Sequence, residues 1–529
     1  MSQTTYPSRA TALRAALMTL KRQRLPLVVA SQIVAVAALA LPQLLRDGAA
    51  DDTAFWPKLM LAIGFSAALT YPILVAVLAS IVIDVEHRAS SWNLWAGLLF
   101  PPGRLARLKA VFALVALALV VVGHALVVLG CAATRGIDTS AQDVARLAVM
   151  MVNVWLVSAC LMWVHLAVAL VFRSQLGNIG LGIVGAFIGV YSLLTSSKVT
   201  YLLLWGYYSL GLGIRISPAT AAYSPWPEHL LRVGVSAVVF AFGAVVFWWW
   251  TGRLAGIPAT PAITTRRRQS ASTVTHAGTT RAPRRRSLLA AEIIKLRRSA
   301  VTPIIGIIVV MTVVTGAVNY ANNTEVLSPG WDSYISQVTL FYGLIFAGLC
   351  ASTITAAVWR GEHTTNSWPM MATTPVTPAR LLLAKAGVVW LAMAVVQVLL
   401  AVATYVGGVI LGLGGAAPVS LVVSLVASLL ATIPLILLQT VLSARIASFA
   451  IPIGIGFVGI VMGILLSLKG AAAATFWPYS QVTLAILMTS TATQLHFSAM
   501  AIVVGVVALS AVGIGLLAFG AGWLVRRVR

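Results

Sequence analysis

The residues best suited to chemistry lie in a seven-residue segment that occurs twice, with Glu, His, Ser and Trp at the same places and 276 positions between the copies. A carboxylate beside an imidazole could serve acid–base or metal chemistry. Neighbouring side chains on a helix point about 100° apart, however, and the zinc-protease spacing H-E-x-x-H is absent. Catalysis is therefore not expected here. The shared residues are Glu86, His87, Ser91 and Trp92 in the first copy, and Glu362, His363, Ser367 and Trp368 in the second.

The repeat continues beyond this segment without a gap. Each Trp is followed by Pro-x-Arg and then by a Lys, at Pro102, Arg104 and Lys109 and again at Pro378, Arg380 and Lys385. A basic tetrapeptide precedes each half, KRQR at 21–24 and KLRR at 295–298. The sequence therefore predicts an internal duplication.

The composition indicates a membrane protein. Of 529 residues, 60% are hydrophobic and only 9% are charged, and the mean hydropathy is +0.96. We expect an all-α polytopic membrane protein with about twelve transmembrane helices, because a span needs roughly 20 apolar residues. They form two tandem six-helix repeats. The expected spans are 26–45, 60–84, 108–131, 146–172, 176–197, 230–251, 301–320, 337–358, 382–413, 418–443, 447–468 and 498–525.

This pattern divides the chain into three segments. Residues 1–251 form the first half, residues 252–300 a basic linker with an elbow helix, and residues 301–529 the second half. The linker is rich in Arg, Ser and Thr, which is typical of a solvated tether. It lacks the interleaved aromatic residues that stack on bases, so no nucleic-acid partner is expected. The three cysteines show no disulfide or metal-binding spacing, and no metal site is expected.

The charge distribution predicts the orientation. The excess of Lys and Arg lies in the N-terminal segment, the linker, the C-terminus and alternate loops. By the positive-inside rule both termini are cytoplasmic, and the basic residues face anionic lipid headgroups. Both copies of the repeated segment then lie on the cytoplasmic side.

Two interpretations of the repeated segment stay open. Trp92 and Trp95, followed by Leu98 and Leu99, could form an amphipathic helix that anchors the chain at the membrane interface. Alternatively, two matched helices around a pseudo-two-fold axis could dock a symmetric partner, with each Glu paired to a basic residue of that partner. The second interpretation accounts for the repeated acid in an acid-poor chain.

The layout resembles the permeases of ABC-2-type ABC transporters, in particular bacitracin and lantibiotic-immunity permeases. These have a basic amphipathic segment before six spans and a cytoplasmic Glu…Trp…Pro…Arg…Lys helix after the second, and both features occur twice here. The resemblance implies an exporter permease of the bacterial inner membrane with two ABC ATPase subunits, and a role in antibiotic resistance. It also implies partly re-entrant outer segments near 201–230 and 470–497. ATP and Mg²⁺ belong to the partner, since this chain lacks G-x-x-x-x-G-K-[ST] and needs no cofactor itself.

Two other classes of membrane protein compete with this interpretation. An ion-coupled secondary transporter of the twelve-span type needs ionisable groups at membrane depth. No Asp, Glu, Lys or Arg lies in the middle of an expected span. A membrane enzyme would need paired carboxylates or a metal, and Asp51-Asp52 is the only adjacent acidic pair. The scarcity of charged residues in the expected spans favours an amphipathic or hydrophobic cargo: an antimicrobial, drug, peptide or lipid. The polar residues that could line its pathway are Asn153, His165, Asn178, Gln397 and Gln439.

Overall fold

The structure of the chain is a computed structural model. The structure describes scattered residues between 26 and 44, together with 52, 54–88, 91, 92, 95, 101–172, 175–194, 202–216, 221–254, 288–297, 301–324, 327–364, 376–415, 419–468, 470, 472–488 and 498–520. The expected first span at 26–45, and with it the count of twelve, therefore lies largely outside the described residues.

Long apolar helices make up the first half. Their starts follow the sequence, since Pro occupies the first turn of α6 and of α9, and Ser140 forms a capping box with Asp143 at the start of α7. Each helix satisfies its own backbone hydrogen bonds, as a lipid environment requires. The elements are α4 (Phe55–Arg88), α6 (Pro102–Thr134), α7 (Ala141–Val171), α8 (Gln175–Leu194), η3 (Leu204–Leu212), β1 (Ile214–Ile216), β2 (Ala221–Tyr223) and α9 (Trp226–Gly252).

The second half follows the same plan after a short helix. Its second span is one 33-residue run from Trp331 to His363, interrupted by the π-helical segment η4. The elements are α10 (Leu288–Arg297), α11 (Val301–Asn322), α12 (Trp331–Phe341), η4 (Tyr342–Phe346), α13 (Ala347–Thr364), α15 (Pro378–Ile410), α16 (Val419–Arg445), α17 (Ala450–Leu468), η5 (Ala472–Phe476), α18 (Ser480–Leu487) and α19 (Ala499–Phe519).

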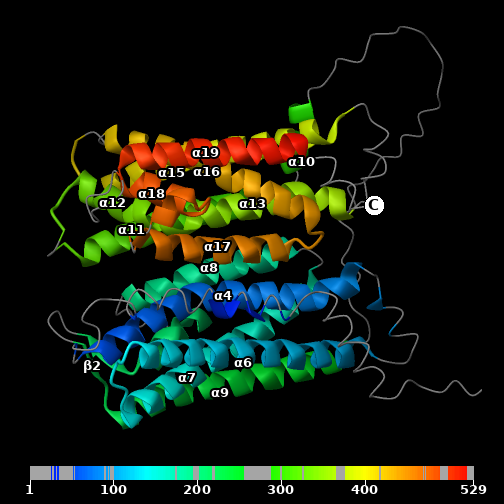
Figure 1. The fold of residues 1–529 in the computed structure, drawn as a ribbon. Coiled ribbons are helices and arrows are strands. Elements are labelled where there is room, and N and C mark those ends of the chain that lie inside the picture. The colour runs from blue at the N-terminus through cyan, green and yellow to red at the C-terminus, as the bar shows by residue number, and fades with distance from the viewer. Residues whose placement is uncertain are drawn as a thin grey trace, which may run out of the picture.

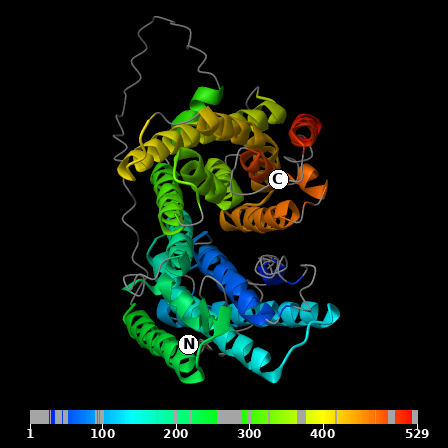
Figure 2. The ribbon, with the colours of Figure 1, turned by 90° about the vertical axis from the view of Figure 1, so that its left-hand side faces the viewer.

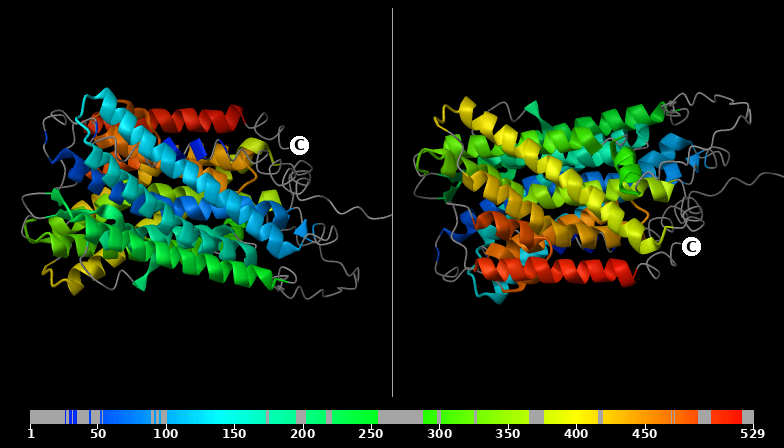
Figure 3. Two further views of the ribbon diagram at one scale, coloured as in Figure 1. Left: turned by 90° about the horizontal axis from the view of Figure 1, so that it is seen from below. Right: turned by 90° about the horizontal axis from the view of Figure 1, so that it is seen from above.

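Within the described residues, eleven helices are long and apolar enough to cross a membrane. They run side by side along one direction, with the β1–β2 hairpin at one end and α10 at the other (Figures 1 and 3). This arrangement and composition establish a multi-pass membrane protein. The end that contains Glu86 and Glu362 is called the motif end below.

The two halves form adjacent groups of helices (Figures 1 and 2). At their boundary α8 packs on α11, and α17 packs on α4. The rings of Phe187 and Phe346 stack across it with their centroids 3.8 Å apart. Neither α8 nor α17 contains an Asp, Glu, Lys, Arg or His residue. These two helices therefore bring no charged side chain to the contact between the halves.

A glycine pattern on α8 and α17 extends the repeat. Both helices read I-G-x-G-x-V-G-x-x-x-G, at 179–189 and 453–463. Gly182 lies against Ala76 of α4, and a Cβ at Gly182 would be 2.9 Å from the Pro72 carbonyl oxygen. Its counterpart Gly456 lies against Ser352 of α13. The small residues let each pair of backbones approach closely.

Short buried helices follow α8 and α17, where the resemblance implied re-entrant segments. Tyr208 of η3 is fully enclosed, and its hydroxyl lies 2.8 Å from Ser158 Oγ of α7. Every residue of α18 is buried, and Thr483 donates to the Gly343 carbonyl, 2.9 Å away, inside the π-helical segment. Both segments thus fold back into their own half.

Candidate functional site

The repeated carboxylate forms an ion pair inside the chain. Glu86 lies in the last turn of α4 and is 3% exposed. Its Oε1 is 2.8 Å from Nζ of Lys109 on α6, and Lys109 also donates to the Val82 carbonyl at 2.7 Å. A buried ammonium of this kind needs both a counter-charge and hydrogen-bond acceptors. This pair holds α6 to the end of α4.

The second half repeats this pair at matched positions. Lys385 of α15 lies 2.8 Å from Glu362 and donates to the Val358 carbonyl at 3.2 Å. Glu362 precedes Lys385 by 23 positions, the separation that also holds for Glu86 and Lys109. The duplicated Glu and Lys of the sequence motif are therefore partners of each other.

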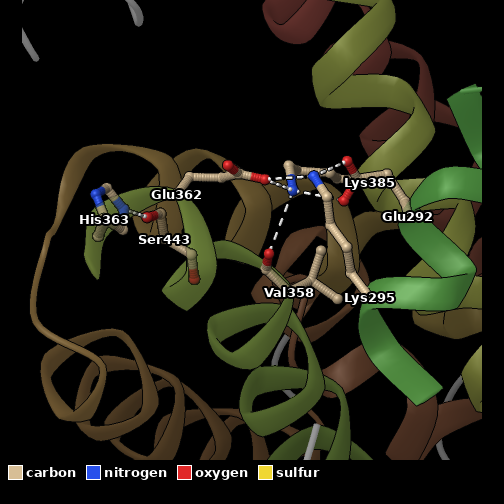
Figure 4. Close-up of polar contacts among 7 residues, drawn as sticks. All are labelled: Glu292, Lys295, Val358, Glu362, His363, Lys385 and Ser443. Carbon is tan, nitrogen blue, oxygen red and sulfur yellow. Dashed lines mark hydrogen bonds and ion pairs between the residues drawn. The ribbon is translucent and has the colours of Figure 1, made fainter. Parts of the chain in front are cut away.

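Two further charges join the second pair from α10 (Figure 4). Glu292 is 2% exposed and lies 2.7 Å from Lys385. Lys295 lies 2.6 Å from Glu292 and 2.9 Å from Glu362. Partial burial would lower the pKa of Lys295, but hydrogen bonds and attraction from the two carboxylates outweigh it, so its pKa is raised. The amine stays charged at physiological pH, and the four charges balance.

In each half, the repeated histidine caps the C-terminal end of a third helix. His87 Nε2 donates to the Ala169 carbonyl at 2.8 Å, and His363 Nε2 donates to the Ser443 carbonyl at 2.7 Å. Both carbonyls lie in the last turn of a helix, α7 or α16, where no main-chain donor follows in the helix. Because a carbonyl can only accept, each imidazole carries its proton on Nε2. Each histidine thus ties the second span to the fourth.

The remaining side chains of the first copy form hydrogen bonds with Glu86 and His87. Ser91 Oγ donates to Glu86, and Trp95 Nε1 donates to the same carboxylate at 3.2 Å. Trp92 is 8% exposed and donates to His87 Nδ1 at 3.3 Å. In the second copy, Ser367 and Trp368 lie outside the described residues.

This geometry corrects one expectation. We expected Glu86 and Glu362 to pair with basic residues of a partner, but the structure buries both carboxylates against lysines of the same chain. The physical reason is that an acid at the end of an apolar helix gains a permanent counter-charge from the next helix. A contact between this end of the molecule and a partner remains a prediction.

The polar residues expected along a pathway lie in packed helix interfaces. His165 Nδ1 is 2.7 Å from Asn178 Oδ1, which links α7 to α8, and Asn178 donates to Ser80 of α4 at 2.9 Å. All five are at most 5% exposed. Their contact with a cargo remains a prediction. The other bonds join Asn153 to the Tyr207 carbonyl, Gln397 to Ser428, and Gln439 to Tyr479.

The two copies of the cluster connect helices in the same way. In each half a Glu–Lys pair and a capping histidine connect three helices within a few residues of one another. In the part of the chain that the structure describes, no group of three His, Cys, Asp or Glu side chains could hold a metal ion. A displacement at the motif end would therefore move three helices together.

A comparison with protein families agrees with the duplication. The family model described as "ABC-2 family transporter protein" matches residues 12–189 and again residues 288–463. The chain belongs to the ABC-2 family of transporter proteins. Members of this family are membrane permease subunits of ABC transporters, and they normally work with ABC ATPase subunits. No curated protein matched the chain.

Sequence reasoning missed three features of the site. Glu292 belongs to the cluster and lies shortly before KLRR. The first half has no acid at the matching position, because Met18 precedes KRQR by the same spacing. The Glu–Lys pairing was also missed, although both residues recur at one separation. The histidines bind backbone carbonyl groups, and no residue type in the sequence identifies such a partner.

Proposed function

We propose that this ABC-2 permease is the membrane-spanning subunit of an ATP-driven exporter of the bacterial inner membrane. It moves an amphipathic or hydrophobic cargo, such as an antimicrobial, drug, peptide or lipid, out of the cell. Two copies of a separate ATPase subunit bind at the motif end, which faces the cytoplasm. The chain itself neither binds nor hydrolyses ATP.

The duplicated polar cluster carries this proposal. A force applied beside Glu86 and His87 reaches α6 through Lys109 and α7 through the Ala169 carbonyl. The same connections exist around Glu362 and His363. Two equivalent contact positions suit a partner that closes as a dimer. Its closure would switch the two halves between two packing arrangements.

The nature of the cargo is inferred from the boundary between the halves. Two of the four helices at this boundary, α8 and α17, carry no charged residue, and an aromatic pair joins the halves. A strongly charged cargo would find no counter-charge on either helix. An apolar surface favours molecules that partition into membranes.

The test is transport with the native ATPase. The tagged chain is purified from host membranes, and the ATPase that accompanies it is identified and co-reconstituted in liposomes. A fluorescent amphipathic dye serves as the probe cargo. We expect ATP-dependent dye movement, with ATP hydrolysis lost when the Walker lysine of the ATPase is replaced.

The control is the chain reconstituted alone, with and without a proton gradient. Transport driven by that gradient in the absence of any ATPase would overturn the proposal in favour of a secondary transporter. Active transport by a complex with one ATPase copy would contradict the proposed stoichiometry.

A further inference from the structure

A tryptophan near the start of the second span occupies the same structural position in both halves. Trp56 Nε1 donates to the Asp138 carbonyl, and Trp331 Nε1 donates to the Gly414 carbonyl, each at 2.9 Å. Both carbonyls lie four residues after the end of the third span, α6 or α15. The two tryptophans are therefore equivalent residues of the internal repeat. They anchor each second span at the end opposite the motif end.

The anchors of the two second spans differ in spacing by one residue. Trp56 and Trp331 are 275 positions apart, whereas Glu86 and Glu362 are 276 positions apart. Both ends of each span are held by matched partners, so the second half must accommodate one additional residue between them. A helix can do this with a single π-helical turn, whose hydrogen-bonded ring contains one residue more than that of an α-helix.

The additional residue lies in η4. The Ala347 amide donates to the Tyr342 carbonyl, five positions back instead of the four of an α-helix. Inside this turn the Gly343 carbonyl accepts a hydrogen bond from Thr483 Oγ1 of α18, 2.9 Å away. Helices bend at π-helical turns and where a side chain bonds into the main-chain ladder. Such turns also occur frequently at functional sites.

The first half has a different defect at the same level. Pro72 lies inside α4 and has no N–H, so the Ala68 carbonyl loses the donor that a regular helix would give it. Ala68 corresponds to Leu344, inside η4, at the offset of 276. Proline is another cause of bending in helices. Both second spans therefore have a weakened main-chain ladder at matched positions, although the chemical cause differs.

Each weakened turn separates two anchored parts of its span. On one side, Glu86 or Glu362 binds a lysine of the next span at the motif end. On the other side, Trp56 or Trp331 is bound to the loop that follows the third span. A displacement at the motif end can therefore be taken up at the weakened turn while the opposite part stays in place.

We propose that the turns Ala68–Pro72 and Tyr342–Phe346 are matched hinges, at which the motif-end parts of the two second spans bend against their opposite parts. Thr483 couples the hinge of the second half to α18, the short helix that folds back into that half. The role of the hinges in transport rests on the proposed function. There they convert a displacement at the motif end into a change of packing between helices.

Hydrogen exchange of the purified full-length chain in lipid nanodiscs tests the hinges directly. Amides in each of the two turns should exchange about tenfold faster than those in adjacent turns of the same span, because local opening is easier where main-chain bonds are weaker. Thr483→Val removes the hydroxyl donor and should raise exchange in the Tyr342–Phe346 turn further. Thr483→Ser keeps the donor and should keep the wild-type rate. Equal exchange along both spans would overturn the inference, as would identical behaviour of the two Thr483 variants.

Straightening each turn tests its role in transport. Deletion of Leu344 removes the additional residue and keeps both anchors in register, and Pro72→Ala restores the missing N–H in α4. Each change should abolish the local maximum of exchange and keep membrane abundance. ATP-dependent dye transport should fall roughly tenfold, since hinge residues often set the rate of a conformational step.

Deletion of Ala357 is the matched control. It also removes one residue from the second span, but it shifts the residues between the π-helical turn and Ala357 against their neighbours. It should therefore lower membrane abundance, whereas deletion of Leu344 should not. Equal loss of abundance in both deletions would show that the additional residue is not accommodated in η4, and the inference would be wrong.

The outcomes separate this inference from the proposed function. Wild-type transport by both straightened variants would show that the two turns are not hinges of the transport cycle, while the proposed function stands. If the wild-type complex shows no ATP-dependent transport, the proposed function fails. Hydrogen exchange and the two deletions then still decide for or against the hinges, because neither measurement needs an ATPase.

Discussion

At the scale of single residues, the two buried ion pairs differ in how they respond to loss of the acid. Glu86→Gln leaves the buried Lys109 ammonium without a counter-charge, which costs about 3–5 kcal/mol. Glu362→Gln should cost clearly less, because Glu292 still lies 2.7 Å from Lys385. The measurement is the apparent melting temperature of each purified variant in detergent.

A double variant serves as the control for this pair. Glu86→Gln combined with Lys109→Met removes both charges, and replacing both members of a buried pair is often close to neutral. Its melting temperature should recover most of the loss. Equal stability of wild type and Glu86→Gln would show that the pair does not form.

The capping histidine should have a smaller effect. His87→Ala removes the donor to the Ala169 carbonyl at the end of α7, and one hydrogen bond contributes about 0.5–1.5 kcal/mol. Hydrogen exchange should speed up in the last turn of α7 and leave the middle of α7 unchanged. Uniform exchange along the whole helix would contradict a local cap.

At the scale of elements, the glycines of α8 set the distance to α4. Gly182→Ala places a Cβ 2.6 Å from the Ala76 Cβ and 2.9 Å from a backbone oxygen that cannot move aside. Overpacking of this kind costs about 1–3 kcal/mol. The expected result is a lower melting temperature.

Gly177 is the matched control on the same helix. A Cβ there meets nothing within 4 Å, and Ala in a helix is more favourable than Gly by roughly 0.5–1 kcal/mol. Gly177→Ala should therefore be neutral or stabilising. Destabilisation of both variants to the same degree would rule out close packing as the cause.

At the scale of the whole molecule, the orientation awaits a direct test. The three native cysteines are replaced, and a single cysteine is placed at Ser270 or at Thr53. An impermeant thiol reagent on intact cells should label only position 53, because the positive-inside rule puts the linker in the cytoplasm. Labelling at position 270 in intact cells would reverse the assignment, and permeabilised cells provide the positive control.

The sequence predicts the helices and the family but little of the contacts. Apolar runs and the gapless repeat identify both halves, and the matched Glu and Lys could have been paired because both recur at one separation. The glycine pattern of α8 and α17 was also available at an offset of 274. The boundary stack of Phe187 on Phe346 could not be foreseen, because nothing in the repeat relates the two residues.

The two ion pairs also set an order for biosynthesis. Glu86 and Lys109 lie at the end of one helix and the start of the next, so their charges can neutralise each other while a single helical hairpin enters the membrane. Glu292 has Lys295 on its own helix from the start, but Lys385 comes 93 positions later. The ribosome therefore synthesises α11 and the span Trp331–His363 before Lys385 can fix α10 to α15. Until then, the Lys295 side chain alone balances the Glu292 carboxylate.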